Sequence, residues 1–141
     1  MIVGIGTDIV EIDRIDNAVN RTNKFIDKVF TYREKEYFKS KNFRAEIMAG
    51  NFAAKEAVSK ALGTGFRGFG LLDIEVLRDD KGKPIVILSD RIYKMLPLNN
   101  FNIHISISHS RENAIAYAVM EVIEWLMFYQ HINARKWIKE L

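Results

Sequence analysis

Residues 2–12 alternate regularly between two sets of side chains, which is the pattern of a β-strand. Asp8 falls on the same face of this expected strand as Gly4 and Gly6. Because glycine weakens the interior of a strand and often marks the close approach of another group, we expect something to lie against this face. Asp8 is then either a functional carboxylate or a strand-end group that caps the next helix.

The spacing of apolar and capping residues predicts several helices. The first is expected at 13–25, with Asp13 as N-cap, and the second at 32–39, with Thr31 and Glu34 forming a capping box. A long helix is expected at about 44–62. A short one should begin after Ser89 or Asp90 as N-cap and end at Leu96. Residues 121–141 carry apolar side chains at helical spacing, interrupted by charges. We expect a docking helix there, which could lie at a subunit interface, rather than a membrane span.

Four further segments have the alternation and the flanking turn residues of strands. These are 73–78 and 84–88, joined by a turn at 79–83, and 103–108 and 114–120, joined through 109–113. Together the elements predict a single compact α+β domain, in which a mainly antiparallel sheet packs on the long central helix.

The central helix carries the residues of greatest chemical interest. Glu56 and Lys60 are four positions apart, so both project from one face of the helix. The simplest interpretation is an exposed ion pair that contributes a few tenths of a kcal/mol. Two observations favour a larger role. The rest of the helix is largely apolar, which predicts burial against the sheet, and it runs directly into a glycine-rich loop at 63–70, whose amides can approach a phosphate.

Asp8 and Glu56 are credible ligands of Mg²⁺, which takes one or two carboxylates and completes its shell with waters and phosphate oxygens. Lys60 would place a positive charge beside the same phosphates. The histidines, His104, His109 and His131, are scattered and lack the spacing of a zinc site. These residues indicate phosphoryl transfer assisted by a metal and a lysine.

The chain has 141 residues, of which 48% are apolar and 28% charged, as is ordinary for one soluble domain. There is no cysteine, which excludes disulfides and thiolate metal sites. The chain has no apolar run of membrane length, and its first residues lack the pattern of a signal peptide. We therefore expect a cytoplasmic protein.

The net charge is only +3, but residues 14–44 hold nine cations against four anions. Such a segment indicates an acidic partner, either nucleic acid or an acidic protein. Arg14, Arg21 and Lys24 are expected on the outer face of the first helix, with Phe25 as an apolar anchor at its end. That combination is typical of binding surfaces, although a solvated face has the same pattern. RNA is disfavoured, because the aromatic pattern of RNA-binding modules is absent.

The run from Phe52 to Gly65, Phe-Ala-Ala-Lys-Glu-Ala-Val-Ser-Lys-Ala-Leu-Gly-Thr-Gly, resembles the signature of the holo-acyl-carrier-protein synthases, the small phosphopantetheinyl transferases. Other blocks of that family are matched in the same order by Gly4-Ile-Gly-Thr-Asp8, Asp73-Ile-Glu-Val76, Gly82-Lys-Pro84 and Ser106-Ile-Ser-His-Ser110. An ordered set of blocks is far more specific than one motif. The resemblance covers residues 1–120, and 121–141 would be a helical extension of the same domain.

The resemblance implies that a serine of apo acyl carrier protein attacks the β-phosphate of coenzyme A, with Mg²⁺ on the diphosphate, and that 3′,5′-ADP leaves. This reaction would support fatty acid biosynthesis. The resemblance also implies a homotrimer with active sites at subunit interfaces. Carried over by position, it implies Asp8, Glu56 and Lys60 as catalytic residues, Asp8 and Glu56 as metal ligands, Arg44, Lys60, Gly63, Gly65, Pro84, His109 and Ser110 as coenzyme-binding residues, and Arg14, Arg21, Lys24 and Phe25 as the carrier-protein surface.

One position departs from the family. Asn51 stands where the family usually has an arginine, so an arginine fork on a phosphate is missing there. Arg44 or Lys41 could compensate, and Asn51→Arg is then expected to lower the Michaelis constant for coenzyme A.

The alternative to an enzyme is a coenzyme-binding module that has kept the fold without catalysis, which the presence of Asp8, Glu56 and Lys60 together disfavours.

Overall fold

The computed structural model describes residues 1–98 and 100–123. A three-stranded antiparallel sheet has the order β1-β5-β4, and a separate antiparallel pair is formed by β2 and β3. The strands are β1 (Ile2–Glu11), β2 (Ile74–Arg78), β3 (Pro84–Leu88), β4 (Phe101–His109) and β5 (Asn113–Val122). The helices are α1 (Ile12–Arg21), α2 (Asn23–Val29), α3 (Tyr32–Ser40), α4 (Ala45–Ala61), the short 3₁₀ helix η1 (Leu71–Asp73) and α5 (Asp90–Met95).

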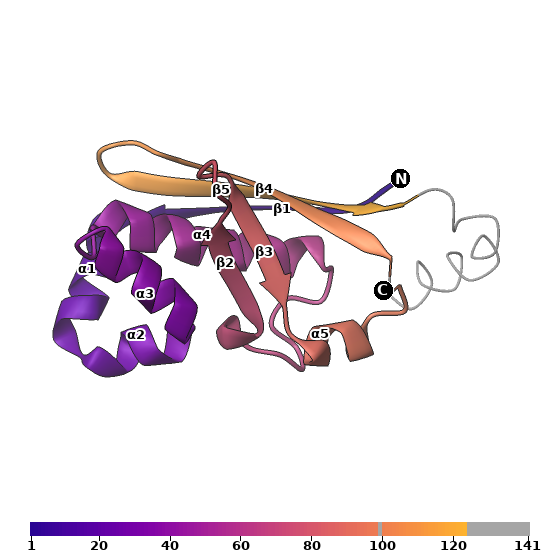
Figure 1. Ribbon diagram of the computed structural model, residues 1–141, viewed down its shortest axis with the longest axis horizontal. Helices are drawn as coiled ribbons and strands as arrows, with labels where there is room; N and C mark the ends of the chain where they lie inside the picture. The colour runs from indigo at the N-terminus through magenta and orange to yellow at the C-terminus, as the bar shows by residue number, and fades with distance from the viewer. Residues whose placement is uncertain (99, 124–141) are drawn as a thin grey trace.

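Helix α4 is the element on which the others are assembled. It lies along one face of the three-stranded sheet and also contacts β2, while α1, α2 and α3 gather at one end of the molecule (Figure 1). This is the predicted α+β arrangement, with a mainly antiparallel sheet packed on a long central helix.

Small residues line part of the sheet face toward α4. Ala114, Ala116 and Ala118 on β5 are buried there, and Ala53 and Ala57 of α4 are fully buried on the helix side. Small side chains on both surfaces allow the helix backbone to lie unusually near the sheet.

The opposite face of the sheet carries large apolar side chains in contact with solvent. Ile5 and Ile9 on β1 are 60% and 64% exposed, and Ile115 and Tyr117 on β5 are 43% and 46% exposed. Register places Ile9 beside Ile115. We call this set, Ile5, Ile9, Ile115 and Tyr117, the outer apolar face.

A buried ion pair joins α4 to the elements at its side. Lys55 and Glu34 are both inaccessible to solvent, and the Lys55 Nζ atom lies 2.7 Å from Glu34 Oε2. Lys55 also donates hydrogen bonds to the backbone oxygens of Val29 and Leu71, and Glu34 accepts hydrogen bonds from the backbone N–H groups of Thr31 and Val76. The pair thereby connects α2, α3, η1 and β2 to the central helix.

The first helix differs from its prediction at both ends. Strand β1 continues to Glu11, and the amide of Ile12 donates to the oxygen of Glu112, so the helix begins at Ile12 and Asp13 lies in its first turn instead of at the N-cap. The helix also stops at Arg21. Thr22 adopts an extended conformation, and its hydroxyl accepts a hydrogen bond from the amide of Lys24, which starts α2.

The other elements agree closely with the pattern in the sequence. The capping box of Thr31 and Glu34 is present at the start of α3. Ser89 is the N-cap of α5, although its hydroxyl donates to Asp73 instead of capping the helix. Strand β5 extends to Val122, so residues 121 and 122 belong to the sheet and not to a helical extension. The docking helix expected in the C-terminal tail lies outside the described residues from 124 onward.

Within residues 1–98 and 100–123, no helix combines the length and the apolar character that a bilayer crossing requires.

Candidate active site

Two glycines of β1 allow α4 to approach the strand that carries Asp8. A Cβ atom at Gly4 would lie 1.9 Å from the backbone oxygen of Ala61, and one at Gly6 would lie 2.0 Å from that of Ala57. Both distances are impossible for a real side chain, so only glycine permits this contact. The close approach expected from the sequence is therefore made by the central helix, and it brings Asp8 against the second half of α4.

Asp8, Glu56 and Lys60 meet on this side of α4, which we call the reactive flank. The Lys60 Nζ atom lies 3.0 Å from Asp8 Oδ1 and donates to the backbone oxygen of Thr7 at 2.8 Å. The side chain of Asp8 is 18% exposed and that of Lys60 is 52% exposed. The ammonium group is thus positioned at the surface, where a ligand can reach it.

The surroundings of Glu56 on this flank shift its pKa. Partial burial raises the pKa of Glu56, the negative charge of Asp8 raises it further, and the positive charge of Lys60 acts in the opposite direction. Two carboxylates that repel each other beside one ammonium group form a site that an additional cation would stabilise.

The donor set fits magnesium. Among residues 1–98 and 100–123, no group of three or more His, Cys, Asp or Glu side chains converges on one point, so the protein's share of a metal shell here would be the two carboxylates of Asp8 and Glu56. A two-carboxylate oxygen set completed by water and phosphate oxygens is what Mg²⁺ commonly takes.

The glycine-rich loop follows the reactive flank directly. Gly63 has a φ of 81°, and its amide donates to the backbone oxygen of Lys60, so this residue ends α4 in the left-handed conformation that glycine favours. Gly65 also has a positive φ, 58°, and no atom lies within 4 Å of the place that its Cβ would occupy. The backbone at Gly65 is therefore open to a ligand.

The other flank of α4 borders a groove. It encloses about 430 Å³ between the first half of α4, the β2–β3 hairpin and β4. We call this space the hairpin groove. Its lining includes Gly50, Arg78, Lys83, Pro84, Ile107 and His109. The groove therefore contains Pro84 and His109, two of the predicted coenzyme-binding residues, together with Arg78, which the sequence did not single out.

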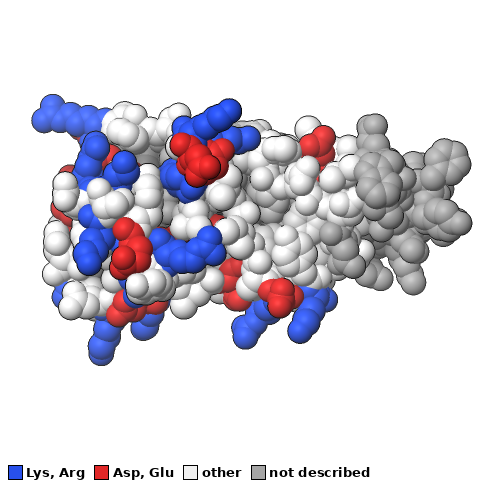
Figure 2. Space-filling model, in the orientation of Figure 1, with Lys and Arg blue, Asp and Glu red and all other residues white. Residues whose placement is uncertain are grey.

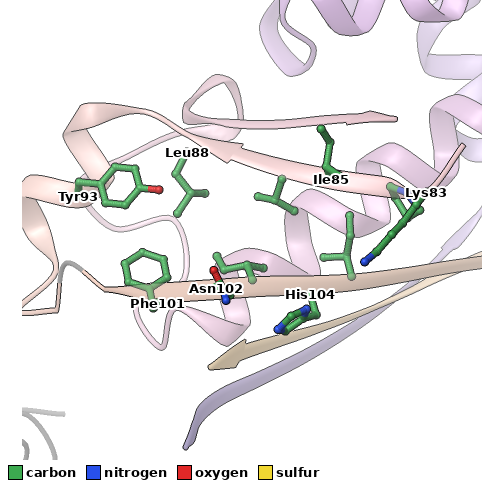
Figure 3. Close-up of a pocket in the computed structure, with 11 residues that line it drawn as sticks. Lys83, Ile85, Leu88, Tyr93, Phe101, Asn102 and His104 are labelled. Atoms are coloured by element: carbon green, nitrogen blue, oxygen red, sulfur yellow. The ribbon is translucent and has the colours of Figure 1, made fainter. Parts of the chain in front are cut away.

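A second hollow of about 320 Å³ continues from the hairpin groove along the seam between β3 and β4, sharing Lys83, Pro84 and Ile105 with it. Figure 3 shows Lys83 at one end of this seam and the rings of Tyr93 and Phe101 at the other. Those rings stack with a centroid separation of 5.6 Å. The seam is therefore apolar at its far end and cationic where it meets the groove.

Two predicted coenzyme-binding residues have clear structural contacts of their own. Arg44 bonds to Glu46 through its Nε atom at 2.8 Å, beside the hairpin groove. The hydroxyl of Ser110 accepts hydrogen bonds from the amides of Glu112 and Asn113, which stabilises the turn between β4 and β5. A coenzyme-binding role for either residue remains a prediction.

The predicted site residues thus form two groups within one chain. Glu56 and Lys60 face β1, whereas Gly50 faces Ile107 of β4 and the hairpin groove. Within one chain, α4 stands between the reactive flank and the groove.

The predicted carrier-protein surface is divided between two helices. Arg14 and Arg21 are exposed on α1, whereas Lys24 and Phe25 belong to α2. Phe25 is half-buried, and its ring lies 6.4 Å from that of Phe52, so it is partly an internal anchor. Basic side chains project from the end of the molecule that contains these helices (Figure 2).

Comparison with known proteins identifies the family of the chain. The sequence model of the 4′-phosphopantetheinyl transferase superfamily matches residues 4–119. The chain belongs to this superfamily. A holo-[acyl-carrier-protein] synthase of Clostridium beijerinckii is 67% identical over 123 residues, which cover 87% of this chain and 100% of that protein. One of Clostridium acetobutylicum is 53% identical over 123 residues, which cover 86% of this chain and 99% of that protein. Within the superfamily the chain is an enzyme of the holo-[acyl-carrier-protein] synthase type.

Solved structures of holo-[acyl-carrier-protein] synthases share the fold. The enzyme of Bacillus anthracis in complex with CoA (3′,5′-ADP) has a TM-score of 0.73 and 44% identity, covering 87% of this chain and 99% of that chain. The enzyme of Helicobacter pylori in complex with coenzyme A has a TM-score of 0.74 and 34% identity, covering 83% of this chain and 99% of that chain. The predicted fold class is confirmed.

Proposed function

We propose that this chain transfers the 4′-phosphopantetheine group from coenzyme A to a serine of apo acyl carrier protein in a magnesium-dependent reaction. The products are holo acyl carrier protein and 3′,5′-ADP, and the reaction supports fatty acid biosynthesis in the cytoplasm. The observation that carries the proposal is the meeting of Asp8, Glu56 and Lys60 on one flank of α4, beside the open glycine loop at Gly65.

In this reaction the serine oxygen forms a bond to the β-phosphorus of coenzyme A, and the bond from that phosphorus to the bridging oxygen breaks. 3′,5′-ADP leaves with the bonding electron pair. Lys60 binds the diphosphate and offsets its charge, as suits an ammonium group that is half exposed and held by Asp8. Mg²⁺ held by Asp8 and Glu56 would, when bound, neutralise charge on the phosphate oxygens.

Glu56 accepts the serine proton through one water molecule. Partial burial and the negative charge of Asp8 both raise the pKa of Glu56 in the metal-free chain, which favours acceptance of a proton, whereas Mg²⁺ bound to Glu56 would lower that pKa.

The experiment that tests the proposal is a mass spectrum of apo acyl carrier protein incubated with this chain, coenzyme A and Mg²⁺. We expect the mass of the carrier protein to increase by one phosphopantetheine group, and we expect no increase in the presence of a chelator. A carrier protein that stays unmodified under all conditions would contradict the proposal.

The acidic carrier protein binds at the exposed cations Arg14 and Arg21 of α1, together with Lys24 and Phe25 of α2. These cations are accessible and lie on a basic segment, which suits a negatively charged partner. The double variant Arg14→Glu/Arg21→Glu is expected to raise the Michaelis constant for carrier protein at least tenfold and to leave that for coenzyme A unchanged. An equal increase for both substrates would contradict this surface.

The chain acts as a homotrimer with active sites between subunits. Two features support this assembly: the outer apolar face offers a surface to a second copy, and α4 separates the reactive flank from the hairpin groove within one chain. The groove of one copy can then serve the reactive flank of its neighbour. Tyr117→Asp should convert the trimer to monomers in analytical ultracentrifugation; a monomeric parent protein with full activity would contradict the assembly.

A further inference from the structure

Asn51, where the resemblance predicted a lost phosphate contact, is a structural residue in this chain. Its side chain is fully buried, and its Nδ2 atom donates a hydrogen bond to the backbone oxygen of Val76 at 2.9 Å. The amide of the same Val76 donates to Glu34. Asn51 and Glu34 therefore satisfy both backbone groups of Val76 on the edge of β2 that β3 leaves unpaired.

The second polar atom of Asn51 holds an arginine. Its Oδ1 atom accepts a hydrogen bond from Arg78 Nη2 at 3.0 Å. The Arg78 Nη1 atom donates to the backbone oxygen of Leu77 at 3.1 Å, and the guanidinium carbon lies 5.1 Å from the centre of the Tyr37 ring. An amide, a carbonyl and an aromatic face thus fix the position of this guanidinium group.

Arg78 keeps donors that these contacts do not use. A guanidinium group has five N–H donors, and Asn51 and Leu77 engage two of them. Among the residues that the structure describes, no carboxylate lies within ion-pair distance of Arg78. Arg78 is half-buried, and this burial lowers its pKa, while Tyr37 and the charge of Glu34 act in the opposite direction. A half-buried guanidinium without a carboxylate partner is suited to bind an anion.

The free side of Arg78 belongs to the hairpin groove. Lys83 and His109 line the same groove, and the single acidic residue that lines it within the described part of the chain, Glu46, is bonded to Arg44. The groove is therefore cationic at this point, and it becomes apolar along the seam toward Tyr93 and Phe101. An anionic group at one end of a ligand would be attracted to Arg78 and Lys83.

We propose that Arg78, positioned by Asn51, binds the 3′-phosphate of coenzyme A and replaces the arginine that the family usually has at position 51. The inference rests on the proposed function. Coenzyme A carries a diphosphate and a separate phosphomonoester, which lies on the part of the molecule that leaves as 3′,5′-ADP. In the proposed trimer, the reactive flank of one copy takes the diphosphate, and Arg78 in the hairpin groove of the neighbouring copy takes the phosphomonoester. A planar guanidinium can bind two oxygens of such a group at once.

This assignment reverses the expectation for Asn51→Arg. A larger side chain at position 51 has no route to solvent, because Asn51 is fully buried. Both polar atoms of its side-chain amide are also hydrogen-bonded. An arginine there must displace Arg78 from its position. We therefore expect Asn51→Arg to raise, and not to lower, the Michaelis constant for coenzyme A.

The decisive variant is Arg78→Met, which removes the charge and keeps an apolar stem against Tyr37. Lys81→Met is the matched control, because Lys81 is an exposed cation in the turn of the same hairpin and does not line the groove. Transfer to carrier protein is measured with coenzyme A and with 3′-dephospho-coenzyme A. Arg78→Met should raise the Michaelis constant for coenzyme A between about tenfold and a hundredfold, the factor expected for a lost charged hydrogen bond. The Michaelis constant of the variant for 3′-dephospho-coenzyme A should stay within about twofold of the parent value. The turnover numbers with coenzyme A and with the dephospho form should also stay within about twofold of the parent values.

A binding measurement separates this inference from the proposed function. Titration calorimetry of the full chain with 3′,5′-ADP and with adenosine 5′-monophosphate compares ligands with and without the 3′-phosphate. Only the affinity for 3′,5′-ADP should fall in Arg78→Met, and Arg78→Lys should restore part of it. If Arg78→Met has the same ratio of Michaelis constants for coenzyme A and the dephospho form as the parent, Arg78 does not bind the 3′-phosphate. The proposed function would still stand. If the parent binds 3′,5′-ADP through Arg78 but modifies no carrier protein, the site stands and the proposed function is wrong.

Discussion

Helix α4 carries two lysines that pair with carboxylates in opposite surroundings. Lys55 is inaccessible to solvent, bonds to Glu34, and uses its remaining donors on two backbone oxygens. Lys60 is half exposed, bonds to Asp8, and lies beside Glu56. The first pair connects secondary-structure elements, and the second leaves a charged surface that a ligand can complete. Two lysines of one helix, each bonded to a carboxylate of another element, thus differ in burial and in the number of donors already used, which suits Lys55 to a structural role and Lys60 to the proposed catalytic role.

The energetics of the two pairs differ accordingly. Burial raises the pKa of Glu34 and lowers that of Lys55, and the pair remains favourable only because each charge has the other and several backbone groups as partners. An exposed pair such as Lys60 and Asp8 contributes about 0–1 kcal/mol to folding. Variants of the first pair should change stability, and variants of the second should change activity.

The largest effect is expected for Glu56→Gln on the reactive flank. This variant removes the proposed base and one metal ligand, and we expect the turnover number to fall by about 10³-fold. The free energy of unfolding should be unchanged or higher, because an amide does not bear the cost of ionisation that partial burial imposes on Glu56. Glu36→Gln on the exposed face of α3 is the matched control for turnover and for thermal unfolding. Full turnover in Glu56→Gln would remove this residue from the mechanism.

The opposite result is expected for Glu34→Gln at the buried pair. The variant leaves the Lys55 charge without its partner, and we expect a loss of about 3 kcal/mol in the free energy of unfolding. This corresponds to a decrease of about 10 °C in the melting temperature. Turnover per folded molecule at 25 °C should stay within about twofold of the parent.

The double variant Glu34→Gln/Lys55→Met sharpens this test, because it removes both charges together. It should recover part of the lost stability in the same thermal unfolding assay. If the double variant is less stable than Glu34→Gln by the full cost of a second substitution, the two side chains do not act as a pair.

The smallest effect is the dependence of stability on pH that Glu56 introduces. The folded-state pKa of Glu56 is higher than the ordinary value of 4.5, so the protonated form stabilises the fold. This stabilising contribution is fully present below pH 4.5 and is lost as the pH rises through the folded-state pKa of Glu56. In the presence of a chelator, the parent should therefore lose melting temperature relative to Glu56→Gln over that interval.

The cause of this dependence can be checked at Asp8. Because the negative charge of Asp8 raises the pKa of Glu56, Asp8→Asn should lower it in a carbon-13 NMR titration of metal-free protein. A pKa of Glu56 that does not change in Asp8→Asn would show that the two carboxylates do not interact.

Features that depend on local order could be predicted from the sequence alone. The alternation in residues 2–11, the capping box of Thr31 and Glu34, and the spacing of Glu56 and Lys60 all reappear in the structure. They could be predicted because the periodicity of a strand or a helix fixes which side chains share a face. The glycines beside Asp8 also indicated a close approach, although the approaching group could be identified only in three dimensions.

The groups that meet across long distances in the chain could be identified only from the folded structure. The sequence links neither Glu34 to Lys55 nor Asn51 to Arg78, and the second pair is 27 positions apart. The start of α1 at Ile12 likewise depends on a hydrogen bond to Glu112. Burial decides the role of each of these residues, because a charge removed from water needs a bonded partner and a half-buried charge with free donors can bind a ligand.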